Sequence, residues 1–220
     1  GVGKTTLAAT TAQSVASHFE RLLWRSLLNA PPLDELLHNL LQRLSGEQLY
    51  DLPATLDRQL ALLLNYLRQQ RCLLVLDNLE SLLQSDQPGQ MRPGYEGYAH
   101  LLRQLAEQEH RSCLLITSRE RPAGLEHWEE DSPQVRMLAL EGLGENEGET
   151  MLRARGVSGS PADASALVRR YSGNPLALKL VAQTVQELFG CDIHAFLAIE
   201  APIFDDIRTV FVQQFARLST

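Results

Sequence analysis

Cysteine, net positive charge and long apolar runs are all scarce in this sequence of 220 residues. Its three cysteines, Cys72, Cys113 and Cys191, lie far apart, and two of them sit inside apolar segments. This pattern predicts buried free thiols and a reducing compartment, namely the cytoplasm. The net charge of −7 argues against a broad surface for nucleic acid or membrane. The apolar runs are too short for a membrane span, and the six histidines lack the spacing of metal ligands.

The first part of the chain alternates between helical and strand patterns. Amphipathic segments predict helices over residues 5–19, 31–44, 55–70 and 98–109. Short apolar runs predict strands over 22–27, 72–76, 112–120 and 135–140. This alternation is typical of an α/β fold, and we expect a parallel sheet flanked by helices within residues 1–143.

Beyond Leu143 the strand patterns stop. Helical patterns cover 145–155, 162–171 and 175–189, followed by a weaker segment at 193–199 and a last one at 206–218. We therefore expect a small all-α helical domain at 144–204 and the start of a linker helix at 205–220.

The chain opens on "GVGKTT", the end of the phosphate-binding pattern G-x-x-x-x-G-K-[ST]. In such loops, backbone N–H groups at the start of a helix surround phosphate oxygens. Lys4 would neutralise the β and γ phosphates, Thr5 would offer its hydroxyl to Mg²⁺, and Thr6 would contact the α-phosphate. The alternative is a chance Gly-Lys-Thr before a helix. The residues predicted to bind nucleotide in this loop are Gly1, Val2, Gly3, Lys4, Thr5 and Thr6.

Asp77 follows the apolar run "CLLVL", where a buried strand would end. Ligands of open parallel sheets bind beyond the carboxyl ends of the strands, and P-loop enzymes need an acid there for Mg²⁺. Asp77 is therefore predicted to be that acid, the alternative being a turn cap. Glu80 either polarises the attacking water or simply sits in the first turn of the next helix. Position 78 holds Asn78 rather than a second acid.

Two further segments supply candidates. Thr117, Ser118 and Arg119 end the strand in "LLITSRE", and Arg119 either senses the γ-phosphate or pairs with its neighbour Glu120 at the surface. In "YSGNPLALKL" the Asn-Pro pair is a good helix start, which explains the segment without any function. Alternatively, the ring of Pro175 packs against adenine.

Together, "GVGKTTLA", "LLWRSL", "CLLVLDNLE", "LLITSRE" and "YSGNPLALKL" occur in the order found in NB-ARC-type STAND ATPases, which the sequence resembles over nearly its whole length. The resemblance implies a nucleotide-binding α/β domain followed by a small helical domain. ADP would hold the two closed, and exchange for ATP would open the protein and permit oligomerisation. It also implies a longer protein, in which the first strand and first motif glycine precede residue 1 and a winged-helix domain follows residue 220.

By position, the resemblance assigns residues 1–6 to the P-loop, Asp77 to the Walker B metal acid, Arg119 to sensor 1 and Pro175 to the adenine contact. Asn78 departs from the common paired-Asp form, and Glu80 stands where the related NACHT branch often has an acid. Lys4, Glu80 and Arg119 are thus the predicted catalytic residues, and Thr5 and Asp77 the predicted metal ligands.

The function expected from these motifs is an ATP/ADP-binding switch with slow ATP hydrolysis and Mg²⁺ as its metal. Its expected partners are the nucleotide, its own flanking domains and, when ATP is bound, further copies of itself. Two alternatives stay open: a scaffold that binds nucleotide without hydrolysing it, and an ATP-dependent transcription regulator.

Overall fold

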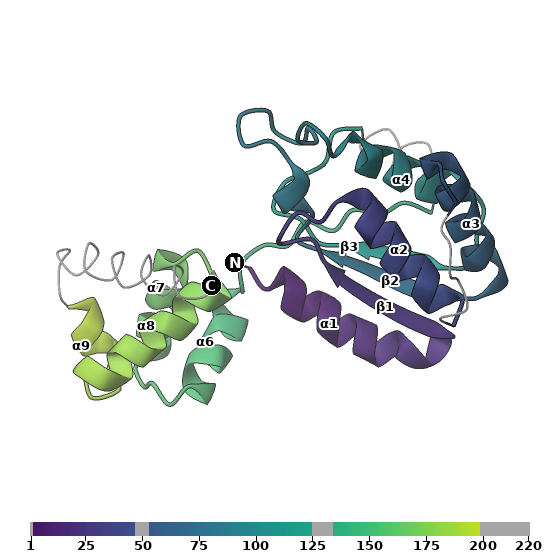
Figure 1. Ribbon diagram of the computed structural model, residues 1–220. Helices are drawn as coiled ribbons and strands as arrows, with labels where there is room; N and C mark the ends of the chain where they lie inside the picture. The colour runs from purple at the N-terminus through teal and green to yellow at the C-terminus, as the bar shows by residue number, and fades with distance from the viewer. Residues whose placement is uncertain (1, 47–52, 125–133, 199–220) are drawn as a thin grey trace. The chain divides into compact units, whose positions relative to one another are not determined.

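The computed structural model describes residues 2–46, 53–124 and 134–198 (Figure 1). They divide into two compact units: Lys4–Ala139, and the chain from Leu140 onward, which is grouped with the residues before Lys4. The predicted domain boundary after residue 143 falls a few residues beyond this division, and the predicted linker helix at 205–220 lies outside the described residues.

Helices and strands alternate in the first unit, and helices alone make up the described part of the second. In chain order the elements are α1 (Lys4–Val15), η1 (Ala16–His18), β1 (Arg21–Ser26), α2 (Leu33–Leu44), α3 (Leu56–Gln69), β2 (Cys72–Asp77), η2 (Leu79–Leu82), α4 (Glu96–Glu107), β3 (Cys113–Ile116), α6 (Glu145–Ala154), α7 (Pro161–Arg170), α8 (Pro175–Leu188) and α9 (Ile193–Leu197).

The three strands form one parallel sheet in the order β1-β2-β3. The pairing of β1 with β2 runs from Arg21 opposite Cys72 to Ser26 opposite Asp77. Every residue of β2 is buried, because the strand has a neighbour on each side and helices on both faces. The predicted α/β fold with a parallel sheet is confirmed.

Each face of the sheet has its own apolar core. Leu74 and Leu76 face helices α2, α3 and α4, which present leucine stripes to them. Leu73 and Val75 point the other way and pack with Ala12 of α1. Because neighbouring strand residues alternate between faces, the continuous apolar run of β2 fills both cores. Figure 1 shows α1 on the opposite side of the sheet from α2.

The predicted strand at 135–140 is wrong, because this described segment forms neither helix nor strand. A strand needs a neighbour for its backbone hydrogen bonds, and no described strand pairs with it. Leu138 is accordingly 78% exposed. The prediction of buried cysteines also fails at Cys113, which is exposed at the start of β3, whereas Cys72 is buried between two strands.

The second unit has a separate core formed by α6, α7, α8 and α9, with Leu152, Leu167, Leu178 and Phe196 among its buried residues. Helices α7, α8 and α9 begin at side-chain caps. At α7 the Ser160 side chain accepts from the Asp163 N–H, and the Asp163 carboxylate accepts from the Ser160 N–H, which makes a capping box. Local sequence therefore determines where these helices start.

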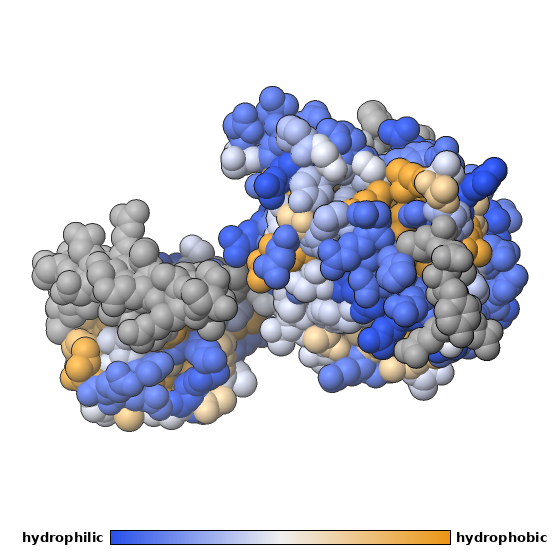
Figure 2. Space-filling view, in the orientation of Figure 1, coloured by the Kyte–Doolittle hydropathy of each residue, from blue (hydrophilic) through white to orange (hydrophobic). Residues whose placement is uncertain are grey.

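The surface in Figure 2 is mainly hydrophilic, with an apolar area among the helices of the first unit. No helix in the described ranges is both long enough and apolar enough to cross a membrane.

Candidate functional site

Three polar side chains from different elements meet at the carboxyl end of the sheet. Asp77 is the last residue of β2, Thr117 directly follows β3, and Thr5 lies in the first turn of α1. The Thr5 hydroxyl donates to Asp77, at 2.9 Å from Oδ1 and 3.2 Å from Oδ2. The Thr117 hydroxyl donates to Asp77 Oδ1 at 2.5 Å. The structure thus brings together Thr5 and Asp77, the two residues predicted to hold a metal.

Asp77 is only 4% exposed, so its carboxylate depends on these hydroxyl donors to compensate for lost water. The carboxylate and the Thr5 hydroxyl are hard oxygen ligands, the type that Mg²⁺ prefers. Thr5 itself belongs to the exposed first turn of α1. A buried acid beside an exposed hydroxyl fits an ion that also contacts a ligand from the solvent side, and these two residues would hold it.

The start of α1 has the properties of an anion site. Gly3 has a φ of 92°, a left-handed conformation that favours glycine, and α1 begins at the next residue, Lys4. Its first turn contains no acidic residue, so nothing opposes the positive end of the helix dipole. Lys4 and Thr6 lie in this turn as predicted, and Val2 precedes it. Gly1 lies outside the described residues.

Glu80 and Arg119 form an ion pair beside the Asp77 cluster. Arg119 Nε lies 3.2 Å from Glu80 Oε1, and the Arg119 backbone N–H donates to Oε2 at 3.3 Å. Asn78 Nδ2 is 3.5 Å from Oε1. The Glu80 side chain is 16% exposed and that of Arg119 is 69% exposed. Arg119 therefore pairs with Glu80, and not with its neighbour Glu120 as one of the two sequence interpretations had it.

Asn78 has a backbone role at this turn. Its φ of 66° is left-handed, a conformation that Asn tolerates better than most residues. The turn sends the chain from β2 into η2, which carries Glu80. Position 78 thus requires a residue that tolerates the left-handed conformation, and the Asn78 side chain is directed to Glu80.

Pro175 lies in the second unit, as the first residue of α8. Asn174 caps this helix, because its Oδ1 accepts from the N–H groups of Leu176 and Ala177. Gly173 packs so closely on the backbone of Leu143 that a Cβ there would collide with the Leu143 carbonyl. These contacts account for the Gly-Asn-Pro segment structurally, and the adenine contact of Pro175 stays a prediction.

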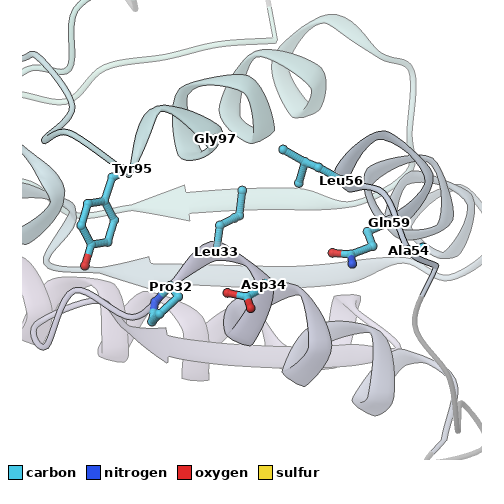
Figure 3. Close-up of a pocket in the computed structure, with 9 residues that line it drawn as sticks. Pro32, Leu33, Asp34, Ala54, Leu56, Gln59, Tyr95 and Gly97 are labelled. Atoms are coloured by element: carbon cyan, nitrogen blue, oxygen red, sulfur yellow. The ribbon is translucent and has the colours of Figure 1, made fainter.

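A cavity of about 530 Å³ opens among the amino ends of α2, α3 and α4 (Figure 3). Leu33, Leu56, Gln59 and Tyr95 contribute to its lining, and none of the predicted site residues does. It is separate from the cluster around Asp77.

Sequence reasoning missed the part played by Thr117, which it had only placed at the end of a strand. The available signal was the alignment of two strand ends: β2 and β3 pair in parallel, with Leu76 opposite Ile116, so the residues that follow them also lie together. Polar residues at both positions then predict a contact.

Three comparisons relate this chain to known proteins. A family model described as the NACHT domain matches residues 1–156. The uncharacterized WD repeat-containing protein alr2800 of Nostoc sp. is 45% identical over 233 residues, which cover 100% of this chain but 18% of that protein. Among solved structures, the Bacillus subtilis DNA clamp loader delta protein (YqeN) matches 99% of this chain and 65% of its own, with 12% identity and a TM-score of 0.36.

The NACHT model covers well over half of the chain. The resemblance drawn from the motifs named the NB-ARC branch of the same class of STAND ATPases, and that finer assignment stays a prediction. Glu80 was the residue matched to the acid of the NACHT branch. The chain belongs to the NACHT family, a family of nucleotide-binding P-loop NTPases.

Proposed function

We propose that this protein is a switch that binds ATP or ADP with Mg²⁺, hydrolyses ATP slowly and thereby controls oligomerisation of a larger multidomain protein. The observation that carries the proposal is the Thr5–Asp77 hydrogen bond. It joins the start of α1 to the end of β2, 72 positions apart in sequence, so the turn proposed to bind phosphate lies next to the acid proposed to bind the metal. The match to the NACHT domain supports this interpretation.

In this proposal the backbone of Gly1, Val2 and Gly3 and the first turn of α1 hold the phosphates, as the helix start favours. Lys4 neutralises the β and γ phosphates and Thr6 contacts the α-phosphate. Mg²⁺, when bound, neutralises charge on the phosphate oxygens. Thr5 and Asp77 hold it, and Pro175 contacts adenine.

The ion pair between Glu80 and Arg119 supplies the sensing and catalytic parts. Arg119 contacts Glu80 through Nε, and its side chain is largely exposed. We expect its terminal guanidinium nitrogens to bind the γ-phosphate. Glu80 is the candidate to orient water. Its carboxylate already bonds to the Arg119 guanidinium, the Arg119 backbone N–H and the Asn78 amide, so a water molecule has to compete with these partners. We expect this competition to keep hydrolysis slow.

The same contacts favour a second candidate function, a scaffold that binds nucleotide without hydrolysing it. If Glu80 only holds Arg119 in place, the site distinguishes ATP from ADP but does not hydrolyse ATP. Multiple turnovers that disappear in Glu80→Gln while ATP binding persists would exclude the scaffold.

Flanking domains and self-association belong to the same proposal. The chain spans 18% of the Nostoc protein, whose name records WD repeats. We expect comparable flanking domains to be the partners of this segment, and ATP to promote homo-oligomers. The motif order that suggests the NB-ARC branch supports the closed, ADP-bound resting form.

The test is Lys4→Ala in the intact protein, with Lys179→Ala as the matched control. Lys179 is exposed on α8 and is the only other lysine of the sequence. We expect Lys4→Ala to weaken Mg-ATP and Mg-ADP binding about 100-fold, since a desolvated charge contact to phosphate is worth several kcal/mol. Lys179→Ala should bind normally. Tight binding by Lys4→Ala would contradict the proposal.

A further inference from the structure

Thr117 is buried, with 7% of its surface exposed. It contacts Asp77, the last residue of β2, and Asn78, the residue after it. Its hydroxyl donates to Asp77 Oδ1 at 2.5 Å and accepts from the Asn78 backbone N–H at 3.0 Å. We propose that Thr117 is a positioning residue, which fixes the Asp77 carboxylate in the orientation that Mg²⁺ binding requires. The inference rests on the nucleotide site proposed above.

The direction of these bonds follows from chemistry alone. A backbone N–H can only donate, so the Thr117 oxygen must accept from Asn78. The single hydroxyl proton is then available to the carboxylate, which as an ion can only accept. Thr117 therefore favours one particular rotamer of an ionised Asp77.

The backbone of Thr117 is fixed as well. Its N–H donates to the Leu76 carbonyl at 3.0 Å, and its carbonyl accepts from the Leu79 N–H at 2.9 Å. With the two side-chain bonds, Thr117 contacts four consecutive residues, 76–79, at the end of β2. Its β-branched side chain also restricts χ1. An anchor held at this many points can orient a carboxylate more strictly than a surface hydroxyl can.

Thr5, the other hydroxyl on Asp77, cannot serve this purpose. It lies in the exposed first turn of α1 and is itself a predicted metal ligand. Thr117 bonds Oδ1, whereas Thr5 lies 2.9 Å from Oδ1 and 3.2 Å from Oδ2. Among the described side chains, Oδ1 is thus held by both hydroxyls and Oδ2 by the longer Thr5 bond alone, so Oδ2 is the oxygen more accessible to a cation.

The alternative role of Thr117 is purely structural, namely closing the turn at Asn78. The two roles differ in what they predict for Mg²⁺. A structural role affects nucleotide binding equally with and without the metal. A positioning role affects the part of the affinity that Mg²⁺ adds, because second-layer partners of metal ligands alter metal affinity by about 10–100-fold.

The experiment is a titration of the intact protein with a fluorescent ADP analogue, once with Mg²⁺ and once with EDTA. The quantity compared is the ratio of the two dissociation constants. Thr117→Val removes the hydroxyl at nearly constant shape, and Thr117→Ser retains it. Thr184→Val is the matched control, because within the described residues the Thr184 hydroxyl donates to the Leu180 carbonyl of its own helix, α8.

We expect Thr117→Val to reduce the Mg²⁺-dependent gain in affinity at least about 10-fold, with binding in EDTA within about twofold of the wild type. Thr117→Ser and Thr184→Val should keep the full gain. An unchanged ratio in Thr117→Val, or equal losses in both buffers, would overturn the inference. If Thr117→Val does not fold, Thr117→Cys replaces it, since a thiol is a weak donor of nearly the size of serine; a full Mg²⁺ gain in that variant would equally overturn the inference.

Failure of the proposed function looks different. A wild-type protein that binds ADP in neither buffer would contradict the nucleotide site itself. A wild type that shows the Mg²⁺ gain, beside a Thr117→Val variant that shows it equally, contradicts only the role of Thr117.

Discussion

In the helical unit, the helix caps formed by Ser160, Asp163 and Asn174 join groups at most three positions apart, although Asp163 also contacts His194 at 3.2 Å. In the α/β unit, Thr5 and Thr117 reach the carboxylate of Asp77 across 72 and 40 positions. The residue types are nearly the same in both units. The first set starts helices, whereas the second gathers three separate elements around one buried acid.

This difference separates structural polar groups from candidate functional ones. A local cap forms whenever its helix forms, because the partners are adjacent in sequence. A long-range cluster exists only after the sheet has assembled, and it buries a charge that the fold alone does not require. Long-range bonds to a buried carboxylate therefore point to a ligand more strongly than the motif residues do singly.

The largest expected effect contrasts two hydrogen-bonded acids, Asp77 and Asp163. Asp77→Asn removes the charge from the proposed metal ligand, and we expect Mg²⁺-dependent ADP binding to fall about 100-fold. Asp163→Asn alters a helix cap and its contact with His194, and this variant should bind ADP normally. Titration of both variants with Mg-ADP measures this, and equal affinities would remove the distinction between the units.

The next effect contrasts two arginines in ion pairs. Arg119 pairs with Glu80, and Arg153 pairs with Glu149 one helical turn away. Arg119→Ala should reduce the preference for ATP over ADP about 10-fold, the cost of one charged contact to the γ-phosphate. Arg153→Ala should leave that preference unchanged. Competition titrations with the two nucleotides supply the measurement, and equal losses for ATP and ADP in Arg119→Ala would contradict the sensor role.

A smaller effect separates two asparagines. Asn174→Ala removes the cap of α8 and should lower the free energy of unfolding by about 1 kcal/mol. Asn78→Gly occupies a left-handed position that glycine adopts freely, so its stability should stay within about 0.5 kcal/mol of the wild type. Urea denaturation monitored by circular dichroism distinguishes the two. A large loss of stability in Asn78→Gly would show that its side chain, rather than its backbone, matters.

The smallest expected effect is a dependence on acid. The Ser160 side chain and then His194 lower the pKa of Asp163, and hydrogen bonds from Ser165 and Arg169 lower the pKa of Glu145. A lowered pKa in the folded state adds stability above the unfolded value, and this is lost as the pH falls through the folded one. The melting temperature of the helical unit should thus decline slightly below about pH 4. The decline should shrink in Ser160→Ala, and a curve identical to that of the wild type would contradict the assignment.

Much of the fold could be predicted, because the spacing of leucines identifies helices and short continuous apolar runs identify buried strands. Helix α3 was expected at 55–70 and β2 at 72–76, and both are confirmed within a residue. The segment 135–140 is also mostly apolar, yet it forms no strand, because strand formation depends on a neighbouring strand that the pattern does not describe. The prediction that Cys113 is buried was wrong for the same reason, because the burial of a strand residue depends on which strands lie beside it.

Within the site, the sequence identifies residue types but not partners. Glu120 was the adjacent candidate for Arg119, whereas parallel pairing of β2 and β3 brings Glu80 to it instead. Asn78 was interpreted as a substituted acid, and its left-handed backbone gives it a second role that only dihedral angles reveal. The position of Thr117 depends on strand register, which one-dimensional patterns do not specify.

The central claim is that Thr5 and Asp77 belong to a nucleotide site. The most direct measurement is to purify the intact protein gently, denature it, and identify any released nucleotide by chromatography, followed by titration of the emptied protein with Mg-ATP. We expect either release of ADP or saturable binding of Mg-ATP. No released nucleotide together with no binding of Mg-ATP would contradict the claim.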